Sequence, residues 1–160
     1  MRSMRFVPVL LLSLLGIGSG CNGSDCNKLA GAVATTFNLD FSRVDIKKQI
    51  KNGVVTAMIV EYVNDNVKGC IDPVTKMDTC PRPVKVVANA PLTAGSEHDL
   101  VNDGVIQRIM QDGSQFKDLD TGYIKFNGLS GDIDGEFYGT FEGGLTINGD
   151  FCGGVIDVNN

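Results

Sequence analysis

Large apolar residues and glycines alternate with polar residues along positions 132–141, and this pattern constrains the fold more than any other. The odd positions hold Ile133, Gly135, Phe137, Gly139 and Phe141, while the even positions hold Asp, Asp, Glu, Tyr and Thr. A period of two places alternate side chains on opposite faces of a β-strand. The segment therefore predicts a strand with one face in a hydrophobic core and the other in water.

The residues on either side of this segment predict its two neighbours. A three-residue loop at 142–144 pairs Phe137 with Gly149, so that an aromatic ring covers a glycine on the adjacent strand. A two-residue turn at 130–131 aligns the preceding strand, and both registers keep the apolar residues on one face. We therefore expect a three-stranded antiparallel meander over residues 122–152.

Most of the remaining chain also favours strands. Asn52-Gly53 is a strong hairpin turn, because both residues tolerate positive φ. Residues 105–110 fit a strand or a helix, and Ser96-x-x-Asp99 could be a helix capping box; we favour the strand. The expected strands upstream of the meander are residues 33–41, 44–51, 54–63, 84–90 and 105–110. The sequence predicts an all-β fold, an antiparallel β-sandwich or small barrel of about seven to nine strands.

Residues 1–20 have the composition of an export signal. Arg2 and Arg5 precede an apolar run over residues 6–17, and small residues follow at 18–20. Twelve helical residues cover about 18 Å, which is short of a bilayer core about 30 Å thick. The arrangement is typical of a secretory signal peptide rather than a transmembrane anchor.

The end of this region, Gly18-Ser19-Gly20-Cys21, resembles the lipobox of bacterial lipoprotein precursors. The resemblance implies that Cys21 becomes the lipid-modified N-terminus, carrying palmitate-type chains, and that Asn22 is compatible with sorting to the outer membrane. The sequence departs from the family at Gly18, where a large aliphatic residue is usual. The alternative is ordinary signal-peptidase cleavage, because Gly18-x-Gly20 also satisfies the small-x-small rule.

The five cysteines favour the lipoprotein interpretation. Lipid on Cys21 leaves an even number of thiols, which suits two disulfides in an oxidising compartment. Cys70 and Cys80 bracket a polar, proline-containing loop and are expected to pair, which leaves Cys26 to pair with Cys152. The absence of a CxxC motif argues against zinc and against redox catalysis.

The C-terminal part of the chain is strongly acidic. In the predicted register Asp132, Asp134 and Glu136 share one face. Glu136 also lies opposite Asp150, where like charges destabilise a sheet. A Ca²⁺ ion held by these four carboxylates would relieve the repulsion, and it is the one cofactor that the sequence suggests. The alternative, which we favour, is that Lys125 on the next strand neutralises Glu136.

The sequence offers little for catalysis. His98, between Glu97 and Asp99, is the only histidine and the one obvious general base. A single histidine in a polar loop is typically solvated, and neither Ser96 nor Ser114 lies in a nucleophile-elbow context. We therefore expect no catalytic residues and no enzymatic activity; a hydrolase using His98 with Asp99 is the least favoured of three functions.

The charge balance limits the partners. With 14 basic against 19 acidic residues the net charge is −5, and a nucleic-acid partner is not expected because phosphate binding needs a basic surface. The basic cluster of Lys47, Lys48 and Lys51 is expected on a solvated hairpin face. Contact of this cluster with anionic headgroups or polysaccharide is the alternative.

These inferences predict a signal peptide at 1–20, a lipidated tether at 21–28 and one β domain at 29–160. The expected protein is exported and held by Cys21 in a lipid bilayer of the bacterial cell envelope, at the outer membrane. Its expected role is structural or an interaction with an envelope protein or polysaccharide. The alternative is a lipocalin-like binder of small ligands, which needs an apolar cavity that the rings over Gly135, Gly139 and Gly149 would close.

Overall fold

The alternating segment forms the expected strand in the computed structural model of the chain, which describes residues 26–159. β8 (Asp132–Phe141) pairs on one side with β7 (Leu119–Phe126) and on the other with β9 (Thr146–Asn159), antiparallel in both cases. Phe137 lies opposite Gly149, as the pattern requires. The predicted meander and its register are confirmed.

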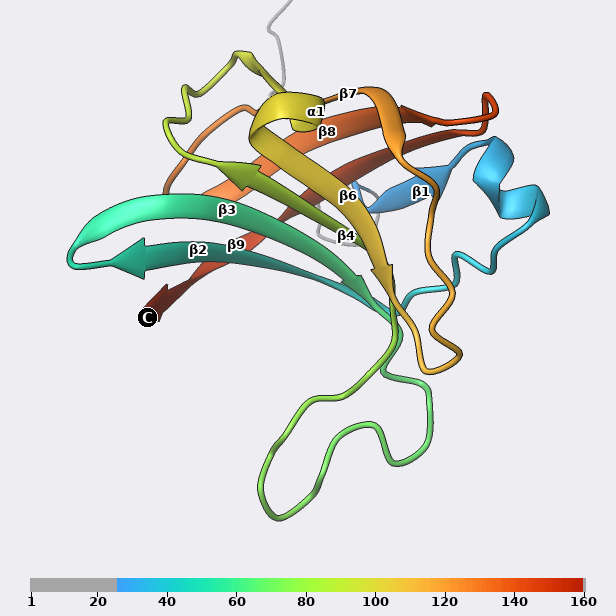
Figure 1. Ribbon diagram of the computed structural model, residues 1–160. Coiled ribbons are helices and arrows are strands. Elements are labelled where there is room, and N and C mark those ends of the chain that lie inside the picture. Colours follow the sequence, from blue (N-terminus) through green and yellow to red (C-terminus); the bar gives the residue numbers. More distant parts are fainter. Residues whose placement is uncertain (1–25, 160) are drawn as a thin grey trace, which may run out of the picture.

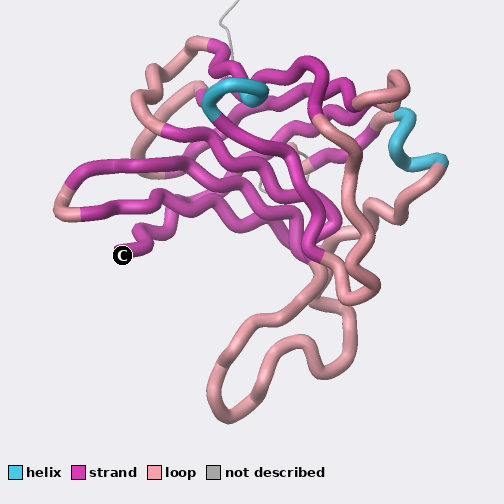
Figure 2. The backbone as a smooth tube through the Cα atoms, viewed as in Figure 1, coloured by secondary structure: helices cyan, strands magenta, loops and turns pink. Residues whose placement is uncertain are grey.

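The other strands extend this meander into one sheet, with the order β5-β7-β8-β9-β2-β3-β4-β6 and β1 beside β9. Figures 1 and 2 show the sheet curled into a nearly closed barrel. The helix α1 (Leu100–Asp103) follows β5 and precedes β6, so it connects the two ends of the sheet. The remaining strands are β1 (Lys28–Ala30), β2 (Arg43–Lys51), β3 (Val54–Val63), β4 (Arg82–Asn89), β5 (Glu97–Asp99) and β6 (Gly104–Ile109). The all-β fold class is confirmed.

One strand pair differs from the expected antiparallel arrangement. β9 continues past the predicted end of the meander at residue 152, and its last part runs parallel to β2, with Val155 opposite Ile46. Two glycines, Gly153 and Gly154, follow directly after the predicted end. They mark the point where β9 changes partner from β8 to β2, since glycine permits a strand to bend.

Residues 33–41 do not form the predicted strand. Ala32–Thr35 is a 3-10 helix, η1, and the chain from there to β2 has no regular structure. Gly31 leads into it with a φ of 131°, a conformation that favours glycine. The apolar residues are nevertheless inward: Val33 is fully buried and Phe37 contacts Phe116 edge to face. The alternation of apolar and polar residues over 33–41 therefore arises because the apolar side chains are buried at one end of the barrel, and not because the segment pairs as a strand.

Of the two disulfides in residues 26–159, one joins distant parts of the chain and the other closes a loop, and both have the pairing expected from the sequence. Cys26 is bonded to Cys152 in β9, and the Cα atoms are 5.9 Å apart. Cys70 is bonded to Cys80, with a Cα separation of 4.5 Å. The segment expected to be a tether is therefore attached to the barrel at Cys26, and β1 already begins at Lys28.

The middle of the barrel is filled by large side chains packed over glycines. A Cβ atom at Gly149 would clash with the Phe137 ring and would lie 2.8 Å from the Lys28 carbonyl oxygen. Tyr62, fully buried, donates a hydrogen bond of 2.7 Å from its hydroxyl to the backbone oxygen of Asp150. These contacts satisfy the buried hydroxyl and leave little space at the centre of the barrel.

We predict that Gly149→Ala destabilises the protein by about 2 kcal/mol, because the added methyl group overpacks a filled interior. Gly128→Ala is the matched control, since a Cβ there has no neighbour within 4 Å. Urea denaturation followed by circular dichroism would measure both. Equal midpoints for the two variants would contradict the packing described here.

Candidate functional site

The four carboxylates of the predicted Ca²⁺ site lie on the expected outer face of the meander. Glu136 in β8 is opposite Asp150 in β9. On the far side of Glu136 lies Lys125 of β7, and on the far side of Asp150 lies Lys28 of β1. Two lysines therefore flank the repelling pair, and Glu97 follows Lys125 in the same row. Within residues 26–159, no group of three His, Cys, Asp or Glu side chains is arranged to hold a metal ion.

Asp132 and Asp134 lie further along the same face of β8. Asp134 accepts a hydrogen bond of 2.6 Å from the side-chain amide of Asn127, so that one of its oxygens already has a partner. The arrangement favours neutralisation by lysine, and the Ca²⁺ site stays a prediction. Cys21, the predicted site of lipidation, and the signal peptide at 1–20 lie outside the described residues.

His98 and Asp99 have separate partners. The Nε2 atom of His98 accepts a hydrogen bond of 3.0 Å from the backbone N–H of Thr93. Asp99 caps α1 and accepts a hydrogen bond of 2.8 Å from the backbone N–H of Val101. Successive residues of a strand point to opposite faces, so this geometry does not support a His98–Asp99 catalytic pair.

The structure separates the basic cluster predicted on one hairpin face. Lys47 lies on the outer face of β2, where it contacts Glu61, whereas Lys48 lies on the inner face beside Met58. The prediction of one shared solvated face is wrong, because adjacent strand positions alternate between faces.

A buried ion cluster on the outer face of β2, β3 and β4 was missed by the sequence analysis. Glu61, in β3, is only 4 % exposed because three basic side chains converge on it. Its Oε2 lies 2.6 Å from Lys47 Nζ and 3.1 Å from Arg82 Nε, and its Oε1 lies 3.1 Å from Lys85 Nζ. The available signal was a single charged residue within an otherwise apolar strand.

The basic neighbours of Glu61 determine its protonation. Burial raises the pKa of this carboxyl group, but hydrogen bonds from Lys47 and Arg82 and their positive charges more than offset burial and lower the pKa from 4.5 to about 2. Glu61 is therefore ionised at neutral pH. A buried carboxylate in this state is strongly destabilising if it loses its partners.

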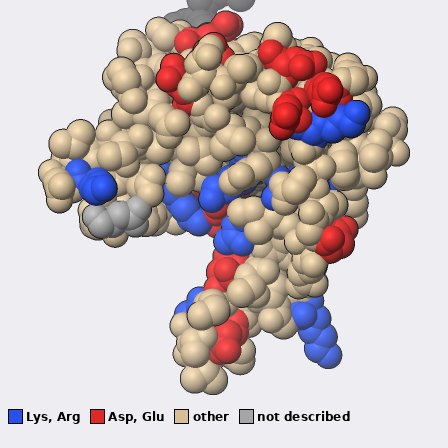
Figure 3. Space-filling model, viewed as in Figure 1, with Lys and Arg blue, Asp and Glu red and all other residues tan. Residues whose placement is uncertain are grey.

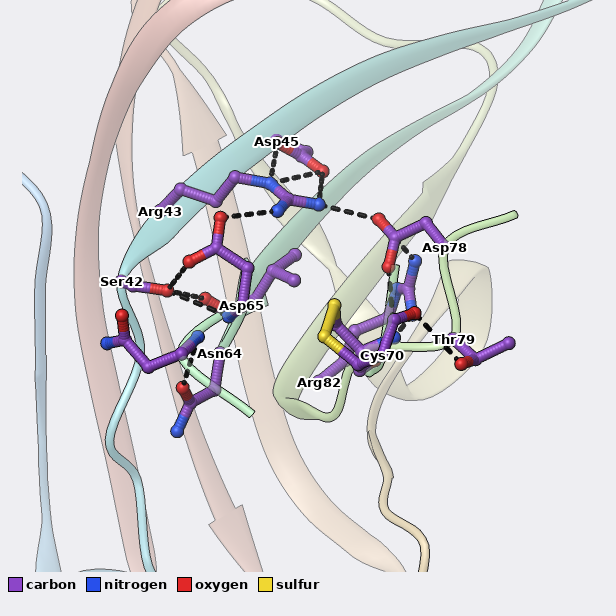
Figure 4. The surroundings of a disulfide bond; sticks show 12 residues. Ser42, Arg43, Asp45, Asn64, Asp65, Cys70, Asp78, Thr79 and Arg82 are labelled. Atoms are coloured by element: carbon purple, nitrogen blue, oxygen red, sulfur yellow. Dashed lines mark hydrogen bonds and ion pairs between the residues drawn. A yellow bond between two sulfur atoms is a disulfide. The ribbon is translucent and has the colours of Figure 1, made fainter. Parts of the chain in front are cut away.

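A second ion network lies next to this cluster and is centred on Arg43 (Figure 4). Its guanidinium contacts Asp65 at 2.7 Å, Asp78 at 2.6 Å and Asp45 at 3.1 Å. Asp78 also lies 3.5 Å from Arg82, which links the network to Glu61. Figure 3 shows basic and acidic side chains interleaved between the barrel and the segment that projects from it.

That segment is the loop between β3 and β4, residues 64–81, which extends away from the barrel (Figure 1). Asp65 and Asp78 come from the two arms of the loop, so Arg43 holds both arms to the start of β2. Cys70 and Cys80 are buried and pack with Val63 in a small hydrophobic cluster of their own. The loop is thus fixed to the barrel by ion pairs and closed by a disulfide.

The tip of this loop, residues 71–79, presents apolar side chains to solvent. Val74 is 86 % exposed, Met77 64 % and Ile71 43 %. The backbone is held by its own hydrogen bonds, because the side chain of Asp72 accepts from the N–H groups of Val74 and Thr75 at 2.7 and 2.8 Å. A bridge between Ile71 and Asp78 adds to these contacts. Residues 71–79, which we call the apolar tip, therefore hold the side chains of Ile71, Val74 and Met77 on a rigid backbone.

Comparison with protein-family models, curated proteins and solved structures finds no match to this chain. Within the described part of the chain, none of the helices has the length and apolar character needed to cross a membrane. The geometry of the loop and the barrel is therefore the basis for the functional argument below.

We predict that Glu61→Gln lowers the free energy of unfolding by about 3 kcal/mol at pH 7, because Lys47, Arg82 and Lys85 lose their common carboxylate. Since the pKa of Glu61 is lower in the folded than in the unfolded state, its contribution is complete above pH about 4.5. That contribution decreases as the pH falls towards 2, so wild type and variant should converge there.

Urea denaturation at a series of pH values would measure this difference. Glu142→Gln, at an exposed position in the loop between β8 and β9, is the control and should follow wild type throughout. A Glu61→Gln deficit that is independent of pH would show that the ionised carboxylate is not its cause.

Proposed function

We propose that the chain is an exported, lipid-anchored and non-enzymatic interaction protein of the bacterial cell envelope, at the outer membrane, and that the apolar tip of residues 71–79 binds a partner protein. The observation that carries the proposal is the exposure of Ile71, Val74 and Met77 together on a loop closed by a disulfide. A cluster of exposed apolar side chains typically marks an interaction site.

Export is supported by the two disulfides, because such bonds persist in oxidising compartments. Anchoring is supported by the resemblance of residues 18–21 to a lipobox and by the even number of cysteines that lipidation of Cys21 leaves. Cys26 lies five positions after Cys21, and five residues span at most about 18 Å. Because Cys26 is bonded to β9, an anchor at Cys21 would keep the barrel close to the membrane.

The rigidity of the loop supports binding by the apolar tip. A loop that is already fixed in its bound conformation loses little entropy on association. Full burial of an apolar side chain contributes about 1.5–3 kcal/mol, so the three side chains together can hold a specific contact. The disulfide and the Arg43 network therefore serve to present these side chains.

A protein suits this tip better than a polysaccharide. Ile71, Val74 and Met77 are aliphatic or thioether side chains, and the carboxylate of Asp72 already accepts two backbone N–H groups. An apolar pocket on the partner would bury these side chains. The exposed Lys76 next to Met77 would favour a partner with acidic groups at the rim of that pocket.

We predict that a photo-crosslinking residue in place of Val74, introduced in cells that produce the full chain, forms one discrete adduct with another envelope protein. The same residue in place of Ile156, which is 53 % exposed on β9, is the control and should give no such adduct. Adding Met77→Asp should abolish the adduct from position 74, because a charge at the tip opposes its burial. The same adducts from both positions, or association of the purified chain with anionic vesicles that depends on Val74, would contradict a protein partner.

The anchor has its own test. We predict that the intact mass of the mature protein corresponds to a chain that begins at an acylated Cys21 and has lost four hydrogens through two disulfides. Cys21→Ser should release the protein from the membrane fraction without a change in the disulfides. An unacylated N-terminus would exclude the anchor. Binding by the apolar tip is tested separately, by the crosslinking experiment.

A further inference from the structure

A hollow of about 500 Å³ lies at the end of the barrel formed by the hairpin of β2 and β3. Its volume falls in the range of small-molecule sites. The walls are apolar apart from one amine, that of Lys48, and the principal lining residues are Lys48, Val54, Val55, Met58, Leu92 and Leu129.

The hollow exists because the hairpin extends further than the strand beside it. β4 is paired with β3 only as far as Asn89, opposite Ala57, whereas β3 begins at Val54. The first residues of β3 therefore have no strand of β4 beside them, and the inner face of the hairpin is left uncovered there. Met58 closes the bottom of the hollow, where it is buried against the core.

The filled centre of the barrel limits how deep a ligand can reach. Phe137 packs over Gly149 and Phe151 over Gly135, and both rings belong to the same buried cluster as Met58. The hollow therefore suits one slender chain lying across the end of the barrel. Rings cover Gly135 and Gly149 as expected, whereas Gly139 faces the aliphatic side chains of Ile106, Leu119 and Ile147. This end of the barrel remains open.

Lys48 gives the hollow a charge preference. Its side chain is 18 % exposed, and its ion pair with Asp157 is long, at 4.0 Å, to a carboxylate that is 59 % exposed. A partly buried ammonium group with a weak partner favours an anion in the adjacent space. None of the residues that line this hollow is an Asp or a Glu, in contrast to the three carboxylates that contact Arg43.

We propose that the hollow binds a single acyl chain with an anionic head group, with the carboxylate on Nζ of Lys48 and the chain along Val55, Met58 and Leu129. Each methylene group that leaves water contributes about 0.8 kcal/mol. This inference does not depend on the function proposed above, because the loop of residues 64–81 follows the other end of β3. A free fatty acid has this chemistry, whereas the ester- and amide-linked acyl chains of a lipidated Cys21 would have no free carboxylate for Lys48.

Calorimetric titration with dodecanoate and with dodecanol tests the proposal in two preparations, the chain from membranes and its Cys21→Ser variant. We expect the Cys21→Ser protein to bind dodecanoate about tenfold more tightly than dodecanol. Lys48→Met should weaken dodecanoate binding about tenfold, or about 1.4 kcal/mol, and leave dodecanol unaffected. Lys51→Met, an exposed lysine on the same hairpin, is the matched control and should behave as wild type.

Comparison of the two preparations identifies the ligand. Dodecanoate binding to both supports a free fatty acid, whereas binding only to Cys21→Ser would show that neutral acyl chains of the protein's own lipid occupy the hollow and would overturn the anionic ligand. Leu129→Glu should abolish dodecanoate binding. Val54→Glu should weaken it as well, and this change at a rim position that is 65 % exposed does not disturb the folded core. No binding in either preparation, or binding that Lys48→Met and Val54→Glu leave unchanged, would overturn the proposal.

Discussion

The packing of aromatic rings over glycines determines the shape of this barrel. A ring can lie directly against a neighbouring strand only where that strand has no side chain, as Phe137 does against Gly149. The interior is consequently filled by rings in contact with the backbone of the sheet, and Tyr62 is hydrogen-bonded to the backbone of β9. Space for other functions remains at the two ends of the barrel and in the loops, where the apolar tip and the hollow are found.

The parts that could be predicted are those in which local pattern and tertiary packing agree. The meander and its register follow from the alternation of apolar and polar residues, because a slip of one residue would move every apolar side chain to the solvent face. The β2–β3 hairpin follows from Asn52-Gly53, whose φ values are both positive. The disulfide pairing followed from the position of Cys70 and Cys80 around one loop, which left a single choice for the other two cysteines.

The parts that could not be predicted depend on contacts between residues far apart in the sequence. Residues 33–41 alternate because they are buried across the barrel end, and a strand has the same period. The Glu61 cluster draws its partners from strands whose alignment is known only once the sheet is assembled. Arg43 likewise meets carboxylates 22 and 35 positions away. A charged residue in an apolar strand was a signal for Glu61, but nothing local indicated Arg43 as the attachment of the loop.

The bond between Cys26 and Cys152 has a mechanical consequence. If the N-terminus is held in a membrane and a partner pulls on the loop of residues 64–81, the tension enters the barrel at β9, which bypasses the short β1. It then crosses β2 to the end of β3. Because β9 is hydrogen-bonded to β2, and β2 to β3, hydrogen bonds of both strand pairs would share such a load.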